Sequence, residues 1–525
     1  MSNSGQLVEL LLPTPFDGLE SETTVSQLSA ESNILQLLLP WQGKGQQQLI
    51  EQDTDEDDDD DDDDGGVDLN QKHPIDTLIL NRSAHVRYLR SFLFQLPSRM
   101  VVLDLSRSWL SYWIIGSLSF LGVDLSLDER KRAIDTIISF QNSSGGFGGG
   151  PGYLSHLAGT YACISTLAIL TSGLTDDLIH QTWSRVDRRG MYDWMLSLKR
   201  SDGSFQVQLN GEIDHRASYA VIAIGTFLNI LTPELIDSLP EFINSTQDYE
   251  GGLASKPTFD RSESHHPGIP LGESHGAYAS CGLATYFMIN DLPSTSSSAF
   301  DLDLQACLRW AAGLQTLPID GGGFKGRTNK LVDGCYSWWS GALFPVLDAL
   351  ISSENSKNLT KGEKLPDLFN RRALQEYILL ISQVHESPNV IEQGGMRDKP
   401  GMDPDVYHSF YVLSGLSLSQ HRHLFDQDSI LKTFKPINDS QKASLSPEAK
   451  NSFNTHREMF FGKNESKEDG LERMKRLYCK TLGWKVSEEE KLVIGLPENE
   501  LKPTHPIFPL RHSILKDTLD YFYNQ

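Results

Sequence analysis

A glycine-marked unit recurs five times along this chain of 525 residues, and the repetition limits the possible folds more than any other feature. The copies read GGFGGG, DGSF, EGGL, GGGF and QGGM, and each precedes a stretch of small and aromatic residues. Aligning these stretches on Tyr161, Tyr219, Tyr278, Tyr336 and His408 gives steps of 58, 59, 58 and 72 residues. A period of this size predicts one repeated supersecondary unit, with functional residues where the copies differ.

The repeated unit is predicted to be helical. Apolar residues follow three- and four-residue spacing over residues 104–122 and 374–383, whereas strand-type alternation is scarce. Each copy is therefore interpreted as helix, Gly-Gly turn, loop and helix. Closing such hairpins into a ring gives an all-α fold, the α/α toroid, although the period alone equally allows an open solenoid. Small residues on the second helices favour the closed ring.

The chain is expected to contain four segments. Residues 1–70 end in an aspartate run, which repels itself, and they are predicted to form a disordered acidic tail. Residues 75–420 are expected to form the toroid, and residues 493–525 to return to it. Between them, residues 421–492 form a charged insertion of unknown role that breaks the period, as does a shorter polar loop at 352–367.

Composition excludes several classes of protein. Twelve of the acidic residues behind the formal net charge of −24 lie between Glu51 and Asp64, and no basic face suggests nucleic-acid binding. No membrane span or secretory leader is expected, because long apolar runs are missing. A reduced, cytoplasmic protein is expected from cysteines that are few, odd in number and widely spaced, namely Cys163, Cys281, Cys307, Cys335 and Cys479.

Three residues at the starts of late repeats could form a metal site. Asp333 and Cys335 lie two apart, and His408 lies at the corresponding place in the next copy. Neighbouring repeats pack side by side, so a carboxylate, a thiolate and an imidazole could converge as three zinc ligands with a fourth position open. The alternative is a helix cap, a buried cysteine and a core histidine. Spacing alone favours this alternative.

Two further groups of residues accompany this candidate site. Arg327, Lys330 and His275 could bind a diphosphate, since arginine gives forked hydrogen bonds and lysine a point charge. The alternative is a solvated basic loop. Trp109 and Trp113 share one helical face, and aromatic residues start later helices. Such stripes are usually core, but at the rim of a toroid they could line an apolar pocket.

Six segments together resemble the β subunits of protein farnesyltransferases: SSGGFGGGPGYLSHLAGTYA, DGSFQVQLNGEIDHRASYA, GESHGAYASCGLA, GGFKGRTNKLVDGCYSWW, DKPGMDPDVYHSFYVLSGLS and GLPENELKPTHP. The resemblance spans residues 76–420, with a short return at 495–523. It implies a toroid that holds one zinc ion, uses Mg²⁺ and works only with a helical α subunit. It also implies farnesyl transfer from farnesyl diphosphate to the cysteine of C-terminal Cys-a-a-X sequences in proteins such as small GTPases.

Matched position by position, the resemblance implies the following roles. The zinc ligands are Asp333, Cys335 and His408, which form the catalytic set with Lys330 and Tyr336. The diphosphate contacts are His275, Arg327, Lys330 and Tyr336. The isoprenoid contacts are Trp109, Trp113, Arg216, Tyr219, Tyr278, Cys281 and Trp339. The peptide contacts are Trp109, Ala158, Arg216 and Tyr407, and the residue linked to Mg²⁺ is Asp398.

Three alternatives remain. A type I geranylgeranyltransferase β subunit would share fold and zinc ligands, but the indole of Trp109 is expected to shorten the pocket floor, and Asp398 stands where that enzyme has lysine. A terpene cyclase would need an acidic motif inside the toroid, and the only aspartate cluster lies in the predicted tail. A binding scaffold with structural zinc would not need the cationic and aromatic groups. Gly159, where the family commonly has proline, leaves peptide preference open.

Overall fold

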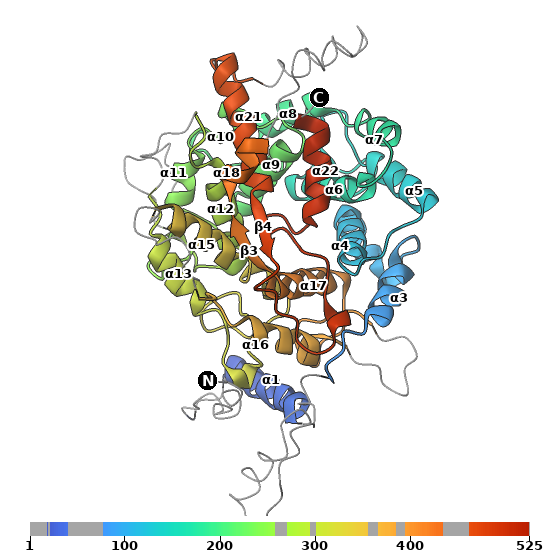
Figure 1. The fold of residues 1–525 in the computed structure, drawn as a ribbon, viewed down its shortest axis with the longest axis vertical. Helices are drawn as coiled ribbons and strands as arrows, with labels where there is room; N and C mark the ends of the chain where they lie inside the picture. Colours follow the sequence, from blue (N-terminus) through green and yellow to red (C-terminus); the bar gives the residue numbers. More distant parts are fainter. Residues whose placement is uncertain are drawn as a thin grey trace, which may run out of the picture.

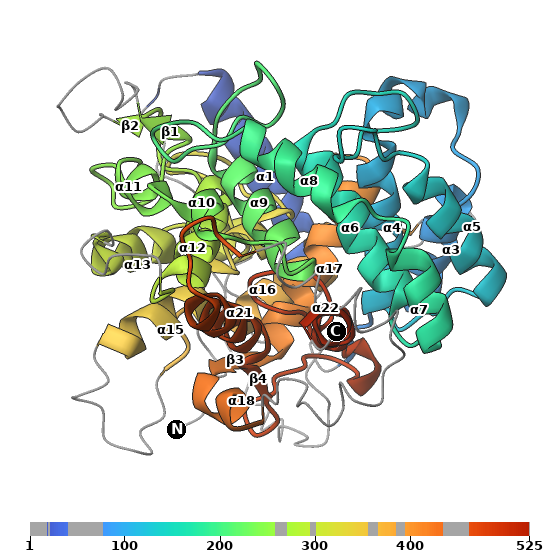
Figure 2. The same ribbon diagram turned by 90° about the horizontal axis from the view of Figure 1, so that it is seen from above.

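The computed structural model describes residues 18, 21–39, 77–257, 270–293, 301–354, 366–384, 394–433 and 461–523. Their helices form two layers around a common axis (Figures 1 and 2). The inner layer consists of α4 (Arg107–Phe120), α6 (Leu157–Thr171), α9 (His215–Phe227), α12 (Gly276–Ile289), α14 (Tyr336–Trp339) with α15 (Leu343–Glu354), and α17 (Val406–Gln420). Each contacts the next, and α17 contacts α4. The ring is therefore closed, which confirms the toroid and excludes an open solenoid.

The outer layer covers the ring with amphipathic helices. α5 has the capping box Ser126–Glu129 and turns Ala133, Ile134 and Ile137 toward the core. Its equivalents in the other repeats pack on inner helices in the same way. The outer helices are α3 (Arg82–Phe92), α5 (Leu127–Ile138), α7 (Asp176–Trp183), α8 (Arg188–Ser197), α10 (Pro233–Ile236), α11 (Leu239–Asn244), α13 (Leu304–Ala312) and α16 (Arg371–Glu376), which continues as the π-helical turn η6 (Tyr377–Ser382).

Inner helices begin at one rim of the ring and end at the other. At the starting rim, every inner helix except α4 has a first turn capped by a side chain that accepts a backbone N–H. The capping residues are His156, Asp214, His275, Asp333 and Asp405. These caps correct the repeat alignment. Tyr161 and Tyr219 lie five residues after their caps, whereas Tyr278, Tyr336 and His408 lie three after theirs. The last three therefore occupy one equivalent position, and the first two occupy another that lies two residues later.

Basic side chains bind the carbonyl groups at the opposite ends of these helices. Their positive charges satisfy carbonyl oxygens that lack partners and oppose the negative end of each helix dipole. The pairs are Arg82 with Leu121 (2.7 Å), Arg130 with Ser172 (2.8 Å), Arg188 with Leu228 (2.6 Å), Lys480 with Phe287 (2.7 Å) and Arg371 with Ser419 (2.8 Å). This arrangement leaves the positive helix ends directed at the starting rim.

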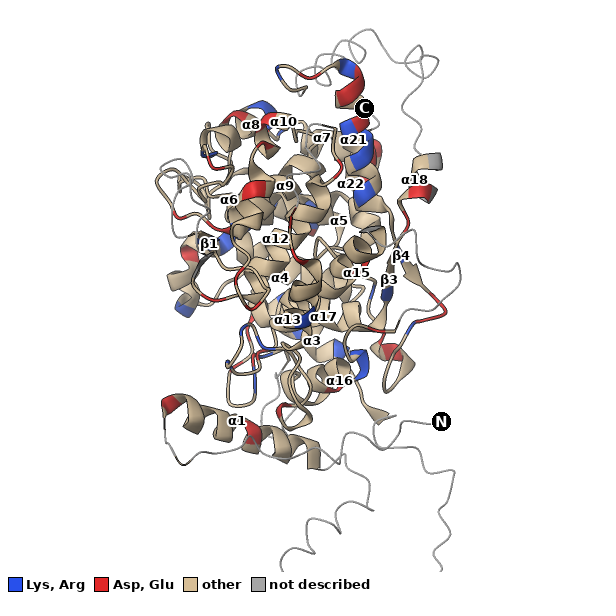
Figure 3. Cartoon of the chain, turned by 90° about the vertical axis from the view of Figure 1, so that its left-hand side faces the viewer, with Lys and Arg blue, Asp and Glu red and all other residues tan. Residues whose placement is uncertain are grey.

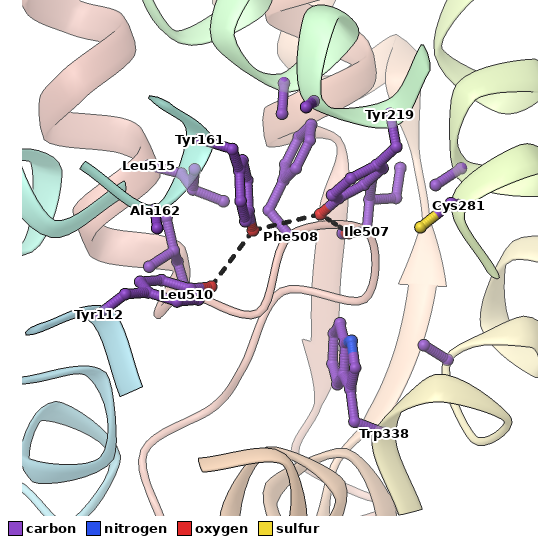
Figure 4. Close-up of a cluster of buried hydrophobic side chains, with 14 of the residues drawn as sticks. Tyr112, Tyr161, Ala162, Tyr219, Cys281, Trp338, Ile507, Phe508, Leu510 and Leu515 are labelled. Carbon is purple, nitrogen blue, oxygen red and sulfur yellow. Dashed lines mark hydrogen bonds between the residues drawn. The ribbon is translucent and has the colours of Figure 1, made fainter. Parts of the chain in front are cut away.

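The C-terminal return fills the ring beneath the aromatic residues of the inner helices (Figure 4). The hydroxyl of Tyr112 lies 3.2 Å from that of Tyr161, which lies 3.3 Å from that of Tyr219. Tyr219 then donates to the carbonyl of Ile507 (3.0 Å), and the neighbouring Phe508 is fully buried. The chain ends the fold with α22 (His512–Tyr523). This last helix packs against α6 and α9 of the inner layer.

Part of the insertion at 421–492 is ordered against the toroid. β3 (Arg422–Phe425) pairs antiparallel with β4 (Trp484–Ser487), and α18 (Gln427–Thr433) and α21 (Lys467–Leu482) lie between them in sequence. α21 packs on α12 and α22, and Figure 3 shows its basic residues. Residues 434–460 lie outside the described residues. A second ladder, β1 (Lys256–Pro257) with β2 (Pro270–Leu271), lies on the loop before α12.

The prediction that residues 1–70 are disordered is wrong for one stretch. α1 (Glu22–Leu38) begins at Ser21, whose side chain caps it, and contacts η5 (Pro318–Asp320) and η6. Ala30 and Ile34, four residues apart, are buried against these elements, which explains why this less charged part folds. The aspartate run lies outside the described residues.

Within the described part of the chain, no helix combines the length and hydropathy needed to cross a bilayer. The five cysteines are buried, and none forms a disulfide.

Candidate metal centre and its surroundings

Asp333, Cys335 and His408 converge at the starting rim, as the repeat argument predicted. One ligand atom from each lies within 4.8 Å of the other two. Asp333 Oδ1 accepts the backbone N–H of Cys335 (2.8 Å) and lies 3.3 Å from His408 Nε2. A thiolate, an imidazole and a carboxylate oxygen are the donors that zinc prefers, and three protein ligands leave a fourth position open. The residues present fit a catalytic zinc ion.

Asp405 orients the imidazole of His408. Its Oδ2 lies 2.6 Å from His408 Nδ1, and its Oδ1 caps the first turn of α17 by accepting the N–H of His408 (2.7 Å). An Nδ1–H that donates to this carboxylate leaves Nε2, which faces Asp333, as the ligand atom. Sequence analysis missed this role, although an aspartate three residues before a candidate histidine ligand could have indicated it.

Without metal, His408 and Cys335 hold protons at neutral pH, whereas Asp333 is ionised. Burial alone would lower the pKa of His408, but hydrogen bonds to Asp333 and Asp405 and their charges raise it to about 9. Burial and the nearby Asp333 charge raise the pKa of the Cys335 thiol well above its usual value. Burial opposes ionisation of Asp333, yet the contact with His408 lowers its pKa. Metal binding must therefore displace protons from the cysteine and the histidine.

His275 and Tyr336 form a neutral donor pair beside the metal centre. The Nδ1 atom of His275 accepts the N–H of Ala277 (3.1 Å), so the ring proton of the neutral imidazole is on Nε2. This N–H lies 3.1 Å from the Tyr336 hydroxyl oxygen, which leaves the tyrosine O–H available to a ligand. Burial, then the charge of Arg327, lowers the pKa of His275 to about 4. His275 therefore supplies a hydrogen bond rather than a charge.

The two predicted cations differ in their surroundings. Arg327 is half-buried and forms an ion pair with Glu273, so an anion must compete with that carboxylate for its guanidinium. Lys330 is exposed and lies in the same loop after Asn329, whose φ of 58° places it in the left-handed region. The first turn of α12 opens on the same region and favours negative charge. Together these groups fit a diphosphate.

An aromatic wall extends from the metal centre across the ring. Trp109 stacks on Trp113 with ring centroids 5.3 Å apart, and Trp113 meets Tyr407 edge-on at 5.2 Å. Trp339 lies 4.7 Å from Tyr411, which sequence analysis did not select. Tyr407 lies 4.9 Å from Tyr411 and so joins the two groups of rings. Some of the predicted peptide contacts and some of the predicted isoprenoid contacts therefore belong to one aromatic surface. Its apolar faces suit an isoprenoid chain.

The remaining predicted contacts lie along α6, α9 and α12. Arg216 pairs with Asp214 (2.6 Å), and its guanidinium carbon lies 5.9 Å from the centre of the Tyr278 ring. Cys281 is buried on the same helix as Tyr278. Tyr219 is buried and directed toward the C-terminal return, away from the capping residues of the starting rim.

Ala158 is half-buried in the first turn of α6 and donates its N–H to His156 Nδ1 (3.1 Å). His156 thus occupies the capping position that His275 occupies in α12. If the repeats are aligned on their capping residues instead of their tyrosines, His156 matches His275, a residue that sequence analysis did select.

Asp398 has one carboxylate oxygen that no group in the described residues binds. Its Oδ2 is paired with Lys399, whereas its buried Oδ1 has no hydrogen-bond partner. Burial and the charge of Asp333 raise the pKa of this carboxyl. Magnesium prefers oxygen ligands of this kind, so the side chain fits the implied Mg²⁺.

Comparison with known proteins places the chain in a family. The prenyltransferase α/α-toroid domain model matches residues 80–510. Protein farnesyltransferase β subunits of Pyricularia oryzae and Schizosaccharomyces pombe are each 37% identical to it, over 65% and 64% of this chain and 64% and 78% of theirs. The Arabidopsis thaliana β subunit is 32% identical over 67% of this chain and 75% of its own. This chain belongs to the protein farnesyltransferase β subunits.

The chain is also similar to subunits of geranylgeranyl transferases. The type-1 geranylgeranyl transferase β subunit of Arabidopsis thaliana is 27% identical over 65% of this chain and 86% of its own. A solved chain of the Candida albicans protein geranylgeranyltransferase-I complexed with GGPP is 21% identical, with a TM-score of 0.47, and covers 65% of this chain and 91% of that chain. Identity to this Arabidopsis geranylgeranyl transferase subunit is lower than to the three farnesyltransferase β subunits named above.

Proposed function

We propose that this chain is the catalytic β subunit of a zinc-dependent protein farnesyltransferase. It transfers farnesyl from farnesyl diphosphate to the cysteine thiol of C-terminal Cys-a-a-X sequences, as a cytoplasmic heterodimer with an α subunit. The observation that carries the proposal is the Asp333–Cys335–His408 cluster, which lies beside anion donors and an aromatic wall. The names of the relatives support the activity.

Each group has a distinct task in this reaction. Zinc held by Asp333, Cys335 and His408 would supply an open position that keeps the substrate cysteine as a thiolate at neutral pH. The sulfur forms a bond to C1 of the isoprenoid as the bond from C1 to the diphosphate oxygen breaks. The products are a thioether and inorganic diphosphate, and no electron is gained or lost overall.

Charge on the leaving diphosphate is stabilised by several donors. The O–H of Tyr336 and the cations of Arg327 and Lys330 would donate to its oxygens as negative charge grows. Asp398 would hold Mg²⁺ through its unpaired oxygen, which offsets the same charge. Positive charge at the allylic carbon is stabilised by the aromatic faces around Trp109.

A geranylgeranyl donor is the second candidate substrate. Trp109 stacks on Trp113, and we infer that this bulky pair shortens the apolar pocket and so favours the shorter farnesyl chain. The experiment is co-expression with an α subunit, followed by zinc analysis and transfer to Cys-a-a-X peptides from each diphosphate, with and without Mg²⁺. Mg²⁺-stimulated farnesyl transfer with one zinc per heterodimer is expected. Geranylgeranyl preference would overturn the assigned chain length but keep the reaction.

If the chain were a binding scaffold with a structural zinc ion, mutation of a zinc ligand would impair assembly. Cys335→Ala should abolish turnover while the heterodimer still forms, because the metal acts on the substrate. Loss of assembly in this variant would favour the structural role instead. Zinc binding without any transfer would also contradict the proposal.

A further inference from the structure

A short stretch of backbone, Met396–Asp398, connects the two segments that carry the metal ligands. We call it the bridging segment. The carbonyl oxygen of Asp398 accepts the N–H of Gly334 (2.8 Å), the residue that separates the first two ligands. At its other end, Met396 forms an isolated antiparallel bridge with Asp405, which orients His408. The position of the bridging segment therefore sets the spacing between Gly334 and Asp405, and with it the spacing of the ligands.

The π-helical turn η6 holds the bridging segment from the outer layer. The hydroxyl of Tyr377 donates to the carbonyl oxygen of Asp398 (2.7 Å), the same oxygen that Gly334 binds. Beside it, Ser382 donates to the carbonyl of Arg397 (2.5 Å), and Arg397 Nε donates to the carbonyl of Ile381 (3.0 Å). A π-helical turn widens a helix locally, and such turns are frequent at functional sites. Here the turn binds both Arg397 and Asp398, the residue whose carbonyl accepts the N–H of Gly334.

The ring of Tyr377 is fixed by its packing. It is fully buried, and a Cβ atom added to Gly323 would lie 2.7 Å from its ring. A Cβ on Gly321, whose φ is +79°, would lie 2.1 Å from Ile381, also on η6. Only glycine fits at these positions, so the Gly-rich turn of this repeat is shaped around η6. On the outer side, α1 contacts η6 and buries Ile34 there.

We propose that Tyr377 is a positioning residue for the metal centre. Its hydroxyl holds the Asp398 carbonyl in place for Gly334, and α1 supports η6 from outside. The inference rests on the proposed zinc role of Asp333, Cys335 and His408. Without the hydroxyl, Gly334 is the one remaining donor to that carbonyl among the described residues. The outer layer then holds the bridging segment through Arg397, one residue away from the Gly334 contact, so the ligand segments are less firmly positioned.

The test is Tyr377→Phe in the full chain, co-expressed with its α subunit. This change removes one oxygen and keeps the ring packed on Gly323. Zinc affinity, measured by competition with a chelator, should fall about tenfold or more, within the range known for partners that orient metal ligands. The absorption spectrum of the Co²⁺-substituted enzyme should shift, and kcat should fall while KM for both substrates changes little.

Tyr523→Phe is the matched control. The Tyr523 hydroxyl also donates to a backbone carbonyl, that of Thr226 (2.9 Å), and the side chain is buried, but it lies on α22. The zinc affinity and the Co²⁺ spectrum of the Tyr523→Phe variant should equal those of the wild type. Ile34→Ala should weaken zinc binding in the same direction as Tyr377→Phe, by a smaller factor.

The outcomes separate the two proposals. Equal zinc affinity and an unchanged Co²⁺ spectrum in Tyr377→Phe would overturn the positioning role while zinc binding by the wild type stands. Equal losses in Tyr377→Phe and Tyr523→Phe would also overturn it, because the effect would then be general destabilisation. An unchanged Ile34→Ala would overturn the part assigned to α1. A wild type that binds no zinc would instead overturn the proposed function.

Discussion

The Nδ1 atom of His408 lies 2.6 Å from Oδ2 of Asp405, and this contact decides which ring nitrogen faces Asp333. The same aspartate caps α17, so a single side chain fixes both the start of the helix and the tautomer of the ligand. The helix start and the ligand geometry are therefore coupled at this rim. Changes to Asp405 can be designed to separate the two effects.

Asp405→Asn should weaken zinc binding about 10- to 100-fold with little loss of stability. Asparagine remains a good helix cap, but its amide can donate to Nδ1 and so favour the wrong tautomer. Zinc affinity and the thermal midpoint would be measured together. Asp303→Asn is the control, since Asp303 caps the outer helix α13 in the same way (2.8 Å to the N–H of Ala306). A similar loss of zinc in both variants would contradict the prediction.

Zinc affinity should rise steeply with pH. The pKa of His408 is about 9 and that of Cys335 is raised above its usual value, so at neutral pH both groups are protonated without metal. Binding must release two protons, and the association constant should rise about 100-fold per pH unit between pH 6.5 and 8.5. Above about pH 9 the slope should fall toward one proton. A pH-independent affinity would show that the ligands are already deprotonated.

Trp109→Ala should increase transfer of the longer geranylgeranyl group relative to farnesyl. The change removes one of two stacked indoles and deepens the apolar wall without touching the metal ligands. A hydrophobic pocket discriminates by about 1 to 3 kcal/mol per small apolar group, so a change of at least tenfold in the ratio of kcat/KM values is expected. Trp194→Ala, on the outer helix α8, should leave the ratio unchanged. An unchanged ratio in Trp109→Ala would show that other residues set the chain length.

Arg473→Met should destabilise the chain without altering the reaction. Arg473 on α21 pairs with the buried carboxylate of Glu465 (2.8 Å) and donates to the carbonyl of Leu231, just beyond α9. Its loss leaves that carboxylate buried without its partner, which costs about 3 to 5 kcal/mol. The double variant with Glu465→Gln should recover part of the loss. A lowered kcat at unchanged stability would instead assign the insertion a role in catalysis.

Acid should destabilise the C-terminal return through His423. Its Nε2 lies 2.7 Å from the carbonyl of Thr504, and burial lowers the pKa of this imidazole to about 3. The unfolded chain binds a proton near pH 6.5, whereas the folded chain does not. Stability contributed by the neutral ring is therefore full above pH 6.5 and is lost below it, by about 1.4 kcal/mol per pH unit.

The His423 prediction is checked by proton uptake on unfolding. At pH 5 the wild type should take up about one proton more than His423→Gln. Glutamine can still donate to Thr504, so the variant should fold. Equal uptake in the two proteins would contradict the prediction.

The repeat could be predicted from the sequence because each Gly-rich turn precedes a helix of small residues. Convergence of Asp333, Cys335 and His408 followed from the same argument, since neighbouring copies start at one rim. The equivalent positions within the repeat copies were harder to predict. Tyrosines were the visible markers, but the caps are the equivalent positions, so Tyr161 and Tyr219 were aligned with residues that lie two places earlier in their helices.

Other features depend on contacts that no local pattern contains. Tyr377 lies in an apolar run, where its hydroxyl cannot be distinguished from that of a core tyrosine. Its partner Asp398 is brought to it by the loop that follows η6. α1 was missed because an acidic run follows it, and the apolar stripe at Ala30 and Ile34 is short. In both cases the deciding partner lies in another part of the fold.

The capping position at the starting rim has a consequence for how such a site can diversify. Five inner helices use it for the same backbone purpose, yet the side chains there are imidazoles in two copies and carboxylates in three. One substitution at this position exchanges a neutral donor for an anion or a metal ligand, while the helix packing beyond the first turn stays as it is. A duplicated hairpin can therefore acquire new chemistry one rim residue at a time, without a new fold.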